Sequence, residues 1–472
     1  MKTVYLMGIG GSGMVSLAGL FVQKGWKVRG SDGPIYPPAS DEIKKLNIKV
    51  FEGYDPKNIQ GDIDLVVVGN VISFSNPEYQ ELVKSGLPVT SMSQAITDFF
   101  IEDRESIVVA GTHGKSTTTS LMAYLLQEYG AGPGFFIGGV PVNFGQGYQS
   151  AKGKYFVIEG DEYDTACFEK TPKFLHYKPR HVILTSIEFD HADIYKDLDQ
   201  ILRQFEKLLQ IIPKGGTLIA SGDDPNVKRL CAGDSRVQFY GTNEDNDWVL
   251  RPIENTSQGK RFQVHHLGQS KGWFETRLFG NHNAKNALAC IAMLSSLGFD
   301  LKLAQEKCQR FLGIRRRQEF LGEVRGVKFY DDFAHHPTAI RETLLGFLPV
   351  KKLAGGKLWA IFEPRSNTVR RRVFEKSLPE SFLEADEVII APVYQKKDQL
   401  QKDDLLRPEE VVKAIVDSQG SARAVGEMKD IEDILFNELK AGDVVVFMSN
   451  GDFKGLTKVV VRHYQRFIER KG

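Results

Sequence analysis

The sequence predicts an α/β protein of three domains, each with a largely parallel sheet. A chain of 472 residues is too long for one hydrophobic core. Short apolar runs alternate with helical patterns along its whole length, as in sheets with crossover helices. Two glycine-rich segments each follow an apolar run and precede a helical pattern, which is typical of nucleotide-binding units. We place the domains at residues 1–98, 99–315 and 316–472.

The first unit has expected strands at 2–8, 27–32 and 64–70 around a helix at 13–25. The segment "GIGGSGM" satisfies G-x-G-x-x-G directly after the first strand, and Asp32 ends the next strand. In one interpretation, the amides of Gly10 to Gly13 hold a diphosphate and Asp32 holds a ribose hydroxyl. In the other, the glycines only form a tight turn that packs the helix on the strand.

The second unit begins at "ESIVVAGTHGKSTTT", where a phosphate-binding loop is expected between a strand and a helix. The common loop G-x-x-x-x-G-K-[ST] needs a glycine at position 109, and this chain has Val109. Gly111 and Gly114 still let the backbone turn around an anion. Lys115 is expected to reach the β- and γ-phosphates, and Ser116 to ligate Mg²⁺. The alternative is a glycine turn with an incidental lysine.

Two further side chains point to a metal beside this loop. Glu159 ends the apolar run "YFVIE", and His191 follows the run "HVILTSI". Carboxyl ends of parallel strands meet at one edge of a sheet, so both are predicted to act as metal ligands with Ser116. A lone His or Glu is more often structural, but this placement favours the metal role.

Composition excludes few function classes. The formal net charge of +1 gives no argument for nucleic acid or a membrane surface as a partner. Cys167, Cys231, Cys290 and Cys308 are widely spaced without a C-x-x-C pair, which fits a reducing compartment. The first apolar run is too short for a signal peptide, and none approaches the roughly 18 residues of a membrane span. We therefore expect a cytoplasmic protein, monomeric or weakly homo-oligomeric.

The third unit has expected strands at 327–334, 357–365, 387–393 and 443–451. The charged stretch at 395–410 is expected to be a solvated loop, and the run Arg370 to Arg372 a solvated helix face rather than a substrate contact.

Four segments, "GTHGKSTTT", "EFDHAD", "NHNAKNA" and "YDDFAHHPT", occur in this order and resemble the ATP-dependent Mur ligases of peptidoglycan metabolism. The resemblance runs over essentially the whole chain. It implies a Rossmann-like domain for a UDP-sugar, a central P-loop ATPase, and a C-terminal Rossmann-like domain for the incoming amine. The family uses a shortened loop, G-T-x-G-K-[ST], so Val109 is no defect. The implied cofactors are ATP and Mg²⁺.

The resemblance assigns roles residue by residue. The residues implied at the UDP-sugar are Gly10, Gly11, Ser12, Gly13, Met14 and Asp32. Those implied at ATP are Gly111, Thr112, His113, Gly114, Lys115, Ser116, Thr117, Asn283, Asn286, Arg317 and Asp332. The metal ligands are Ser116, Glu159 and His191. The catalytic group comprises Lys115, Glu159, His191 and His335, and His113, His335 and His336 line the cleft. The histidine pair also reads as a capped helix start before Pro337.

Several Mur ligases carry a lysine, carbamylated in use, about fifteen residues after the metal histidine. This chain has "RQFEKLL" in that region, which leaves Glu206 as an alternative to a carbamate on Lys207. The base that accepts the proton of the incoming amine is not identified.

Within the family, "FEPRSNT", "FMSNGDF" and the long segment at residues 160–195, which lengthens the interval from Glu159 to His191, resemble the member that adds the tripeptide L-Ala-γ-D-Glu-meso-diaminopimelate to UDP-MurNAc in murein recycling. The residues implied at the peptide are Arg365, Ser366, Asn367, Asn450 and Gly451, with Arg365 a buried partner for a carboxylate. The alternatives are the UDP-MurNAc–L-alanine ligase and, more distantly, a nucleotide-binding oxidoreductase or regulator.

Overall fold

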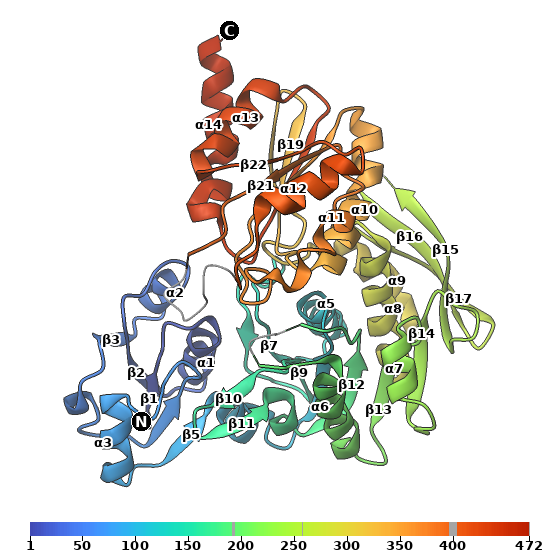
Figure 1. The fold of residues 1–472 in the computed structure, drawn as a ribbon. Helices are drawn as coiled ribbons and strands as arrows, with labels where there is room; N and C mark the ends of the chain where they lie inside the picture. Colours follow the sequence, from blue (N-terminus) through green and yellow to red (C-terminus); the bar gives the residue numbers. More distant parts are fainter. Residues whose placement is uncertain (191–193, 257, 396–403, 472) are drawn as a thin grey trace.

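The computed structural model describes residues 1–190, 194–256, 258–395 and 404–471. Three large sheets form the centres of three α/β domains, accompanied by a separate two-stranded sheet, which confirms the predicted fold class. The N-terminal and central domains lie side by side, and the C-terminal domain lies above their junction in Figure 1. Among the described residues, no helix has both the length and the apolar character that a membrane crossing requires.

The N-terminal sheet is parallel, with strand order β3-β2-β1-β4-β5. The predicted strand at the N-terminus is confirmed, and the glycine-rich loop follows it directly. The elements are β1 Thr3–Met7, α1 Ser12–Gln23, β2 Lys27–Asp32, α2 Ala39–Lys45, β3 Lys49–Glu52, β4 Leu65–Val68, α3 Pro77–Ser85, β5 Val89–Ser91 and α4 Met92–Ile96.

The central sheet has the order β17-β16-β15-β14-β13-β12-β6-β9-β7-β8. Its parallel part places β6 between β12 and β9, so the loops after these three strands meet at one edge. The elements are β6 Glu105–Ala110, α5 Lys115–Glu128, β7 Gly134–Phe136, β8 Tyr148–Gln149, β9 Tyr155–Gly160, β10 Asp164–Ala166, β11 Glu169–Pro172, β12 Pro179–Leu184, α6 Leu198–Ile211, β13 Thr217–Ser221, α7 Pro225–Leu230, β14 Val237–Gly241, β15 Trp248–Thr256, β16 Gly259–His266, β17 Gln269–Thr276, α8 Asn281–Ser296 and α9 Leu301–Lys307.

The C-terminal sheet has the order β18-β19-β23-β20-β21-β22, parallel except for β18. The carboxyl ends of β19, β20 and β23 are neighbours, because β23 pairs with both of the others. The elements are β18 Glu319–Val324, β19 Val327–Asp332, α10 Pro337–Ala354, β20 Leu358–Phe362, α11 Leu378–Ser381, β21 Glu387–Ile390, α12 Pro408–Asp417, β22 Ala422–Ala424, α13 Met428–Glu438, β23 Val444–Met448 and α14 Leu456–Lys471.

The N-terminal and central domains share part of one hydrophobic core. The ring of Tyr148 lies against α1 at Gly19, where a Cβ would stand 2.1 Å from Cζ of Tyr148. The Tyr148 hydroxyl donates a hydrogen bond to Glu42 of α2 at 2.7 Å. The N-terminal domain is therefore packed on the central one by apolar contact. The exact boundaries at residues 98 and 315 stay predictions; Asp98 lies in a π-helical turn, Thr97–Ile101.

Three expectations for secondary structure were wrong or incomplete. Arg370 is buried in a turn and Arg371 is half-buried in a β-bridge with Leu405, so of the three arginines only Arg372, exposed in a short 3-10 helix, fits the expected solvated helix face. Pro408 begins α12, so the end of the charged stretch is helical, and its middle, residues 396–403, lies outside the described residues. The antiparallel strands β15 to β17 were not expected at all.

Candidate active site

The phosphate-binding loop lies between β6 and α5, as predicted. Gly111 has a φ of +126° and Gly114 a φ of +79°, and both are closely packed. A Cβ on Gly111 would lie 2.3 Å from Oγ1 of Thr185, and one on Gly114 would lie 2.7 Å from Oδ1 of Asn286. Positive φ and these approaches require glycine at both positions.

The loop is fixed by hydrogen bonds from the segment after β12. The amides of Thr112 and His113 donate to the backbone oxygen and Oγ of Ser186, at 2.8 and 3.1 Å. The Thr185 hydroxyl donates to the His113 carbonyl at 2.6 Å. We infer that Gly114 and the first turn of α5, whose amides have no partner within the helix, offer the N–H groups for an anion.

Lys115 lies at the start of α5, and its ammonium is surrounded by oxygen atoms. It donates to the Gly111 carbonyl at 2.6 Å and to Oε2 of Glu162 at 3.1 Å. Burial alone would lower the pKa of Lys115, but Glu162 and Asp161 outweigh burial and raise it. The Lys115 ammonium is therefore protonated and fixed by hydrogen bonds at the position where phosphates are expected.

Glu159 stands at the end of β9, level with Val109 of the neighbouring strand. Its carboxylate accepts hydrogen bonds from the Gly138 amide at 2.8 Å and from the Ser116 hydroxyl. Burial raises the pKa of Glu159. The carboxylate and hydroxyl oxygens meet beside Lys115, and such a set fits Mg²⁺. The third predicted ligand, His191, lies outside the described residues.

The central and C-terminal domains meet at a cluster of His113, Glu188 and His336. Oε2 of Glu188 lies 3.0 Å from Nε2 of His113 and 3.5 Å from Nδ1 of His336. Thr338 of α10 donates to the same oxygen at 2.7 Å. Burial would raise the pKa of Glu188, but the bonds from His113 and Thr338 prevail and lower it to about 2. The cluster thus joins the phosphate-binding loop to α10.

Both interpretations of the histidine pair describe part of the structure. His336 is the N-cap of α10, accepting from the Thr338 amide at 3.3 Å, and its ring lies 4.8 Å from that of His113. Burial lowers the pKa of His336 to about 4. His335 is half-buried; its Nδ1 contacts the Phe333 carbonyl at 2.9 Å, and burial lowers its pKa.

A second contact joins the central and C-terminal domains, and neither Glu188 in the first contact nor the residues of this one were predicted from the sequence. The Thr368 hydroxyl donates to Oδ1 of Asp190 at 3.0 Å, with both residues buried. Glu188 and Asp190 lie in the acidic segment "IEFD" at the end of a predicted strand, and this placement was the sequence feature that could have identified them as site residues.

Arg317 and Asp332, the predicted ATP residues near the start of the C-terminal domain, lie close to each other beside Phe333 and Gln318. The Arg317 guanidinium lies 4.7 Å from the ring of Phe333, and burial lowers its pKa. Asp332 accepts from the amides of Gln318 and Ala334 at 2.8 and 2.7 Å. Asp332 therefore fixes the linker, and its contact with ATP stays a prediction.

The two asparagines of α8 form a chain behind the phosphate-binding loop. Asn286 donates to Asn283 at 3.2 Å, and Asn283 donates to the Phe279 carbonyl at 2.8 Å. Asn286 reaches the loop at Gly114, whereas Thr117 is buried inside α5. The roles of Asn283 and Asn286 near the adenine, and of Thr117 at ATP, stay predictions.

In the N-terminal domain, Asp32 holds the glycine-rich loop. It accepts from the Gly10 amide at 2.7 Å, the Gly33 amide at 2.7 Å and the Tyr54 hydroxyl at 3.0 Å. Gly11 and Ser12 are exposed, whereas the Met14 side chain is in the core. One amide expected on a diphosphate is therefore engaged by Asp32, and the ribose contact stays a prediction.

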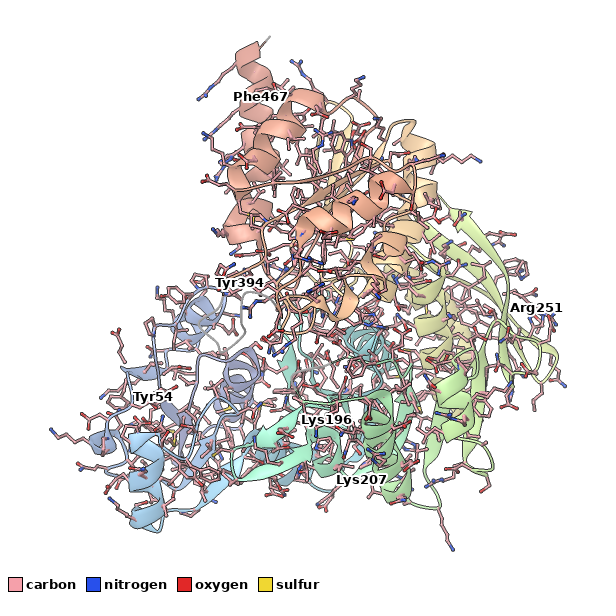
Figure 2. The ribbon with its side chains drawn as sticks, viewed as in Figure 1. Tyr54, Lys196, Lys207, Arg251, Tyr394 and Phe467 are labelled. Atoms are coloured by element: carbon pink, nitrogen blue, oxygen red, sulfur yellow. The ribbon has the colours of Figure 1, made fainter. Side chains whose placement is uncertain are left out.

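The predicted peptide residues gather at the carboxyl ends of β20 and β23. Arg365 lies across Gly451, where a Cβ would stand 2.1 Å from Cδ of Arg365, and 4.0 Å from the ring centroid of Tyr394. Figure 2 shows Tyr394 on the side of the C-terminal domain that faces the other two domains. The Arg365 side chain is 27% exposed, so the expected buried guanidinium was wrong. Ser366 accepts from the Val369 amide at 3.2 Å, and Asn367 and Asn450 are half-buried.

The alternative to a carbamylated lysine was also wrong. Glu206 and Lys207 are both exposed on α6, where Lys207 contacts Gln204 at 3.1 Å. Lys207 lies at the outer rim of the central domain in Figure 2. The helical period turns both residues away from the sheet edge, so neither supplies charge to the site.

Family models match the chain along nearly its whole length. The model described as "Mur ligase family, catalytic domain" matches residues 3–104, "Mur ligase middle domain" residues 109–294, and "Mur ligase, glutamate ligase domain" residues 316–451. The chain belongs to the Mur ligase family. As a Mur ligase it is an ATP-dependent enzyme that forms amide bonds.

Two similar relatives are UDP-N-acetylmuramate–L-alanyl-γ-D-glutamyl-meso-2,6-diaminoheptandioate ligases. The Escherichia coli (strain K12) enzyme is 36% identical over 96% of both chains. The Haemophilus influenzae enzyme is 34% identical over 98% of this chain and 99% of its own. A UDP-N-acetylmuramate–L-alanine ligase of Alkaliphilus metalliredigens is 33% identical over 96% of this chain and 95% of its own. The crystal structure of a murein peptide ligase from Psychrobacter arcticus 273-4 aligns with a TM-score of 0.71 at 34% identity, covering 98% of this Mur ligase and 99% of that chain.

Proposed function

We propose that this Mur ligase joins UDP-MurNAc to the tripeptide L-Ala-γ-D-Glu-meso-diaminopimelate with consumption of ATP and Mg²⁺, in cytoplasmic murein recycling. The full-length similarity to two ligases named for that tripeptide supports the choice most directly. It is higher than the similarity to the alanine ligase by only a few per cent identity. UDP-MurNAc–L-alanine ligation is therefore the second candidate.

The geometry supports a cleft with three substrate regions. The glycine-rich loop after β1 is assigned to the UDP-sugar, the loop after β6 to ATP, and the edge at β20 and β23 to the peptide. Contacts of Glu188 and Asp190 with α10 and Thr368 bring the last two together. This proximity is what a reaction between an activated carboxylate and a peptide amine requires.

The proposed reaction has two steps. The lactyl carboxylate of UDP-MurNAc attacks the γ-phosphate of ATP, giving an acyl phosphate and ADP. The α-amine of the peptide then attacks the acyl carbon, and phosphate leaves as the amide forms. Lys115 would neutralise charge on the transferring group. Ser116, Glu159 and His191 would hold Mg²⁺, which supplies further charge neutralisation at the phosphates.

Closure of the C-terminal domain would exclude water, because an acyl phosphate hydrolyses. In this scheme Asn283, Asn286, Arg317 and Asp332 contact the nucleotide. Arg365, Ser366, Asn367, Asn450 and Gly451 contact the peptide.

Phosphate release tests the proposal. Release should require UDP-MurNAc, ATP and the tripeptide together, with L-alanine a poor replacement. Equal rates with L-alanine would make the chain the alanine ligase. Turnover of NADH, or no release with either amine, would remove the ligase assignment altogether.

A further inference from the structure

The carboxylate of Glu363 is fully buried at the carboxyl end of β20, where it directly follows the strand. Its Oε2 atom accepts from the Ser449 hydroxyl at 2.6 Å and from the Phe453 amide at 3.4 Å. Its Oε1 atom receives no hydrogen bond from any group in the described part of the chain. Buried carboxylate oxygens normally have donors, so this one needs an explanation.

Asn450 supplies a second acceptor of the same kind. Its Oδ1 atom is buried and accepts no hydrogen bond from the residues that the structure describes. Asn450 directly follows Ser449, and Ser449 is the residue that donates to Glu363. Gly451 in turn donates its amide to the Ser449 hydroxyl at 2.7 Å. Two acceptors without donors therefore meet at one place: Asn450 lies in the loop after β23, and Glu363, after β20, is hydrogen-bonded to that loop through Ser449.

The cationic side chain of Arg365 lies next to the Glu363 carboxylate. Nη1 of Arg365 lies 3.7 Å from Oε1 of Glu363, which is beyond hydrogen-bond reach. Gly451 on one side and the Tyr394 ring on the other confine the arginine. A positive donor group and a negative acceptor group thus lie next to each other, each with bonding capacity left for another molecule.

We propose that Glu363 and Asn450 bind the ammonium group at the distal end of the tripeptide, while Arg365 binds the carboxylate beside it. The inference rests on the proposed tripeptide function and extends it to a residue not previously assigned. The side chain of diaminopimelate ends in an ammonium and a carboxylate on the same carbon. A pair of opposite charges at 3.7 Å matches such a zwitterion better than either charge alone.

The test compares three tripeptides that differ only in the third residue. meso-Diaminopimelate carries both distal groups, 2-aminopimelate lacks the distal amine, and L-lysine lacks the distal carboxylate. The wild type should prefer the diaminopimelate peptide over the aminopimelate peptide by roughly 10- to 100-fold in kcat/KM, as expected for a charged hydrogen-bonded group.

Glu363→Gln keeps the shape of the side chain and removes its charge. It should lower kcat/KM for the diaminopimelate peptide and bring it within about threefold of the aminopimelate peptide, with the KM for UDP-MurNAc unchanged. Glu380→Gln, an exposed glutamate of α11, is the matched control and should preserve the preference. Asn450→Ala should reduce the preference in the same direction, and it serves if Glu363→Gln does not fold.

Two results would overturn the subsite. One is an equal loss on both peptides in Glu363→Gln, which would make the residue structural. The other is a wild type that uses both peptides equally well, which would remove the subsite and leave tripeptide ligation standing. A wild type that ligates L-alanine and no tripeptide would instead contradict the proposed function itself.

Discussion

The ammonium of Lys115 lies 3.1 Å from the Glu162 carboxylate, and the Glu162 side chain is only 3% exposed. The lysine proposed to bind phosphates therefore also neutralises a buried acid of the segment after β9. These two roles separate in mutants, because the second concerns stability and the first concerns catalysis.

Lys115→Ala should abolish ligation, because the transferring phosphoryl group loses its cationic partner. It should also destabilise the protein, since the buried Glu162 carboxylate loses its ion pair with the Lys115 ammonium. Phosphate release and urea unfolding measure the two effects. Adding Glu162→Gln to Lys115→Ala should restore much of the stability and none of the activity. Wild-type turnover in either variant would refute the ATP-site assignment.

Glu159→Ala and His191→Ala should each lower kcat by orders of magnitude through loss of a Mg²⁺ ligand. Glu159→Gln is the matched variant, because its amide oxygen can still accept from Gly138. High Mg²⁺ should rescue Glu159→Gln better than Glu159→Ala. The metal role would be disproved by a complex with an ATP analogue in which both side chains lie more than about 6 Å from any metal ion.

A fall in pH should destabilise the packing of the C-terminal domain on the central domain at His336. Burial holds the pKa of His336 at about 4, below its ordinary value of 6.5. Between these values the unfolded state binds the proton and the folded state does not, so stability falls as pH drops from about 6.5 towards 4. The facing groups are His113, His335, Glu188 and Asp190.

From pH 7 to pH 5 the His336 contribution should fall by about 1–2 kcal/mol. Urea unfolding of the wild type and of His336→Gln at both pH values measures it. The variant should lose less stability over this range than the wild type. Parallel losses in the two proteins would show that His336 does not titrate as described.

Arg365→Ala should raise the KM for the tripeptide and leave the KM for UDP-MurNAc nearly unchanged, because the two substrates are assigned to different domains. The guanidinium is partly exposed and has carboxylates of Glu363 and Asp452 within 4 Å, so the loss should be about 1–3 kcal/mol, or roughly 5- to 150-fold in kcat/KM. Steady-state kinetics with each substrate varied checks this.

Gly451→Ala provides an independent test of the same contact. Its Cβ would stand 2.1 Å from Cδ of Arg365, so the guanidinium must move. The tripeptide KM should rise as in Arg365→Ala, and the double variant should be no worse than the worse single one. Additive losses would mean that Gly451 acts by another route.

The sequence predicted the strands whose ends carry the site, because apolar runs followed by glycine or acidic residues mark the carboxyl edge of a parallel sheet. Gly111, Lys115 and Glu159 could be placed in this way. The pairs Lys115–Glu162, Glu188–Thr338 and Glu363–Ser449 could not, since each joins segments that only the folded chain brings together.

The errors have the same origin. The local sequence around Arg370 to Arg372, or around Glu206 and Lys207, does not indicate which of these side chains neighbouring elements will bury. Arg370 is buried and Glu206 is exposed because of the neighbouring elements rather than of local pattern. The antiparallel strands β15 to β17 were missed because their alternation lies outside the nucleotide-binding motifs.

The proposed function requires that this Mur ligase attaches a tripeptide rather than an amino acid. A competition assay tests it most directly: UDP-MurNAc and ATP are mixed with equal concentrations of L-alanine and L-Ala-γ-D-Glu-meso-diaminopimelate, and the products are separated and identified by mass spectrometry. UDP-MurNAc-tripeptide should form in large excess from the earliest time point. UDP-MurNAc-L-alanine as the main product would contradict it.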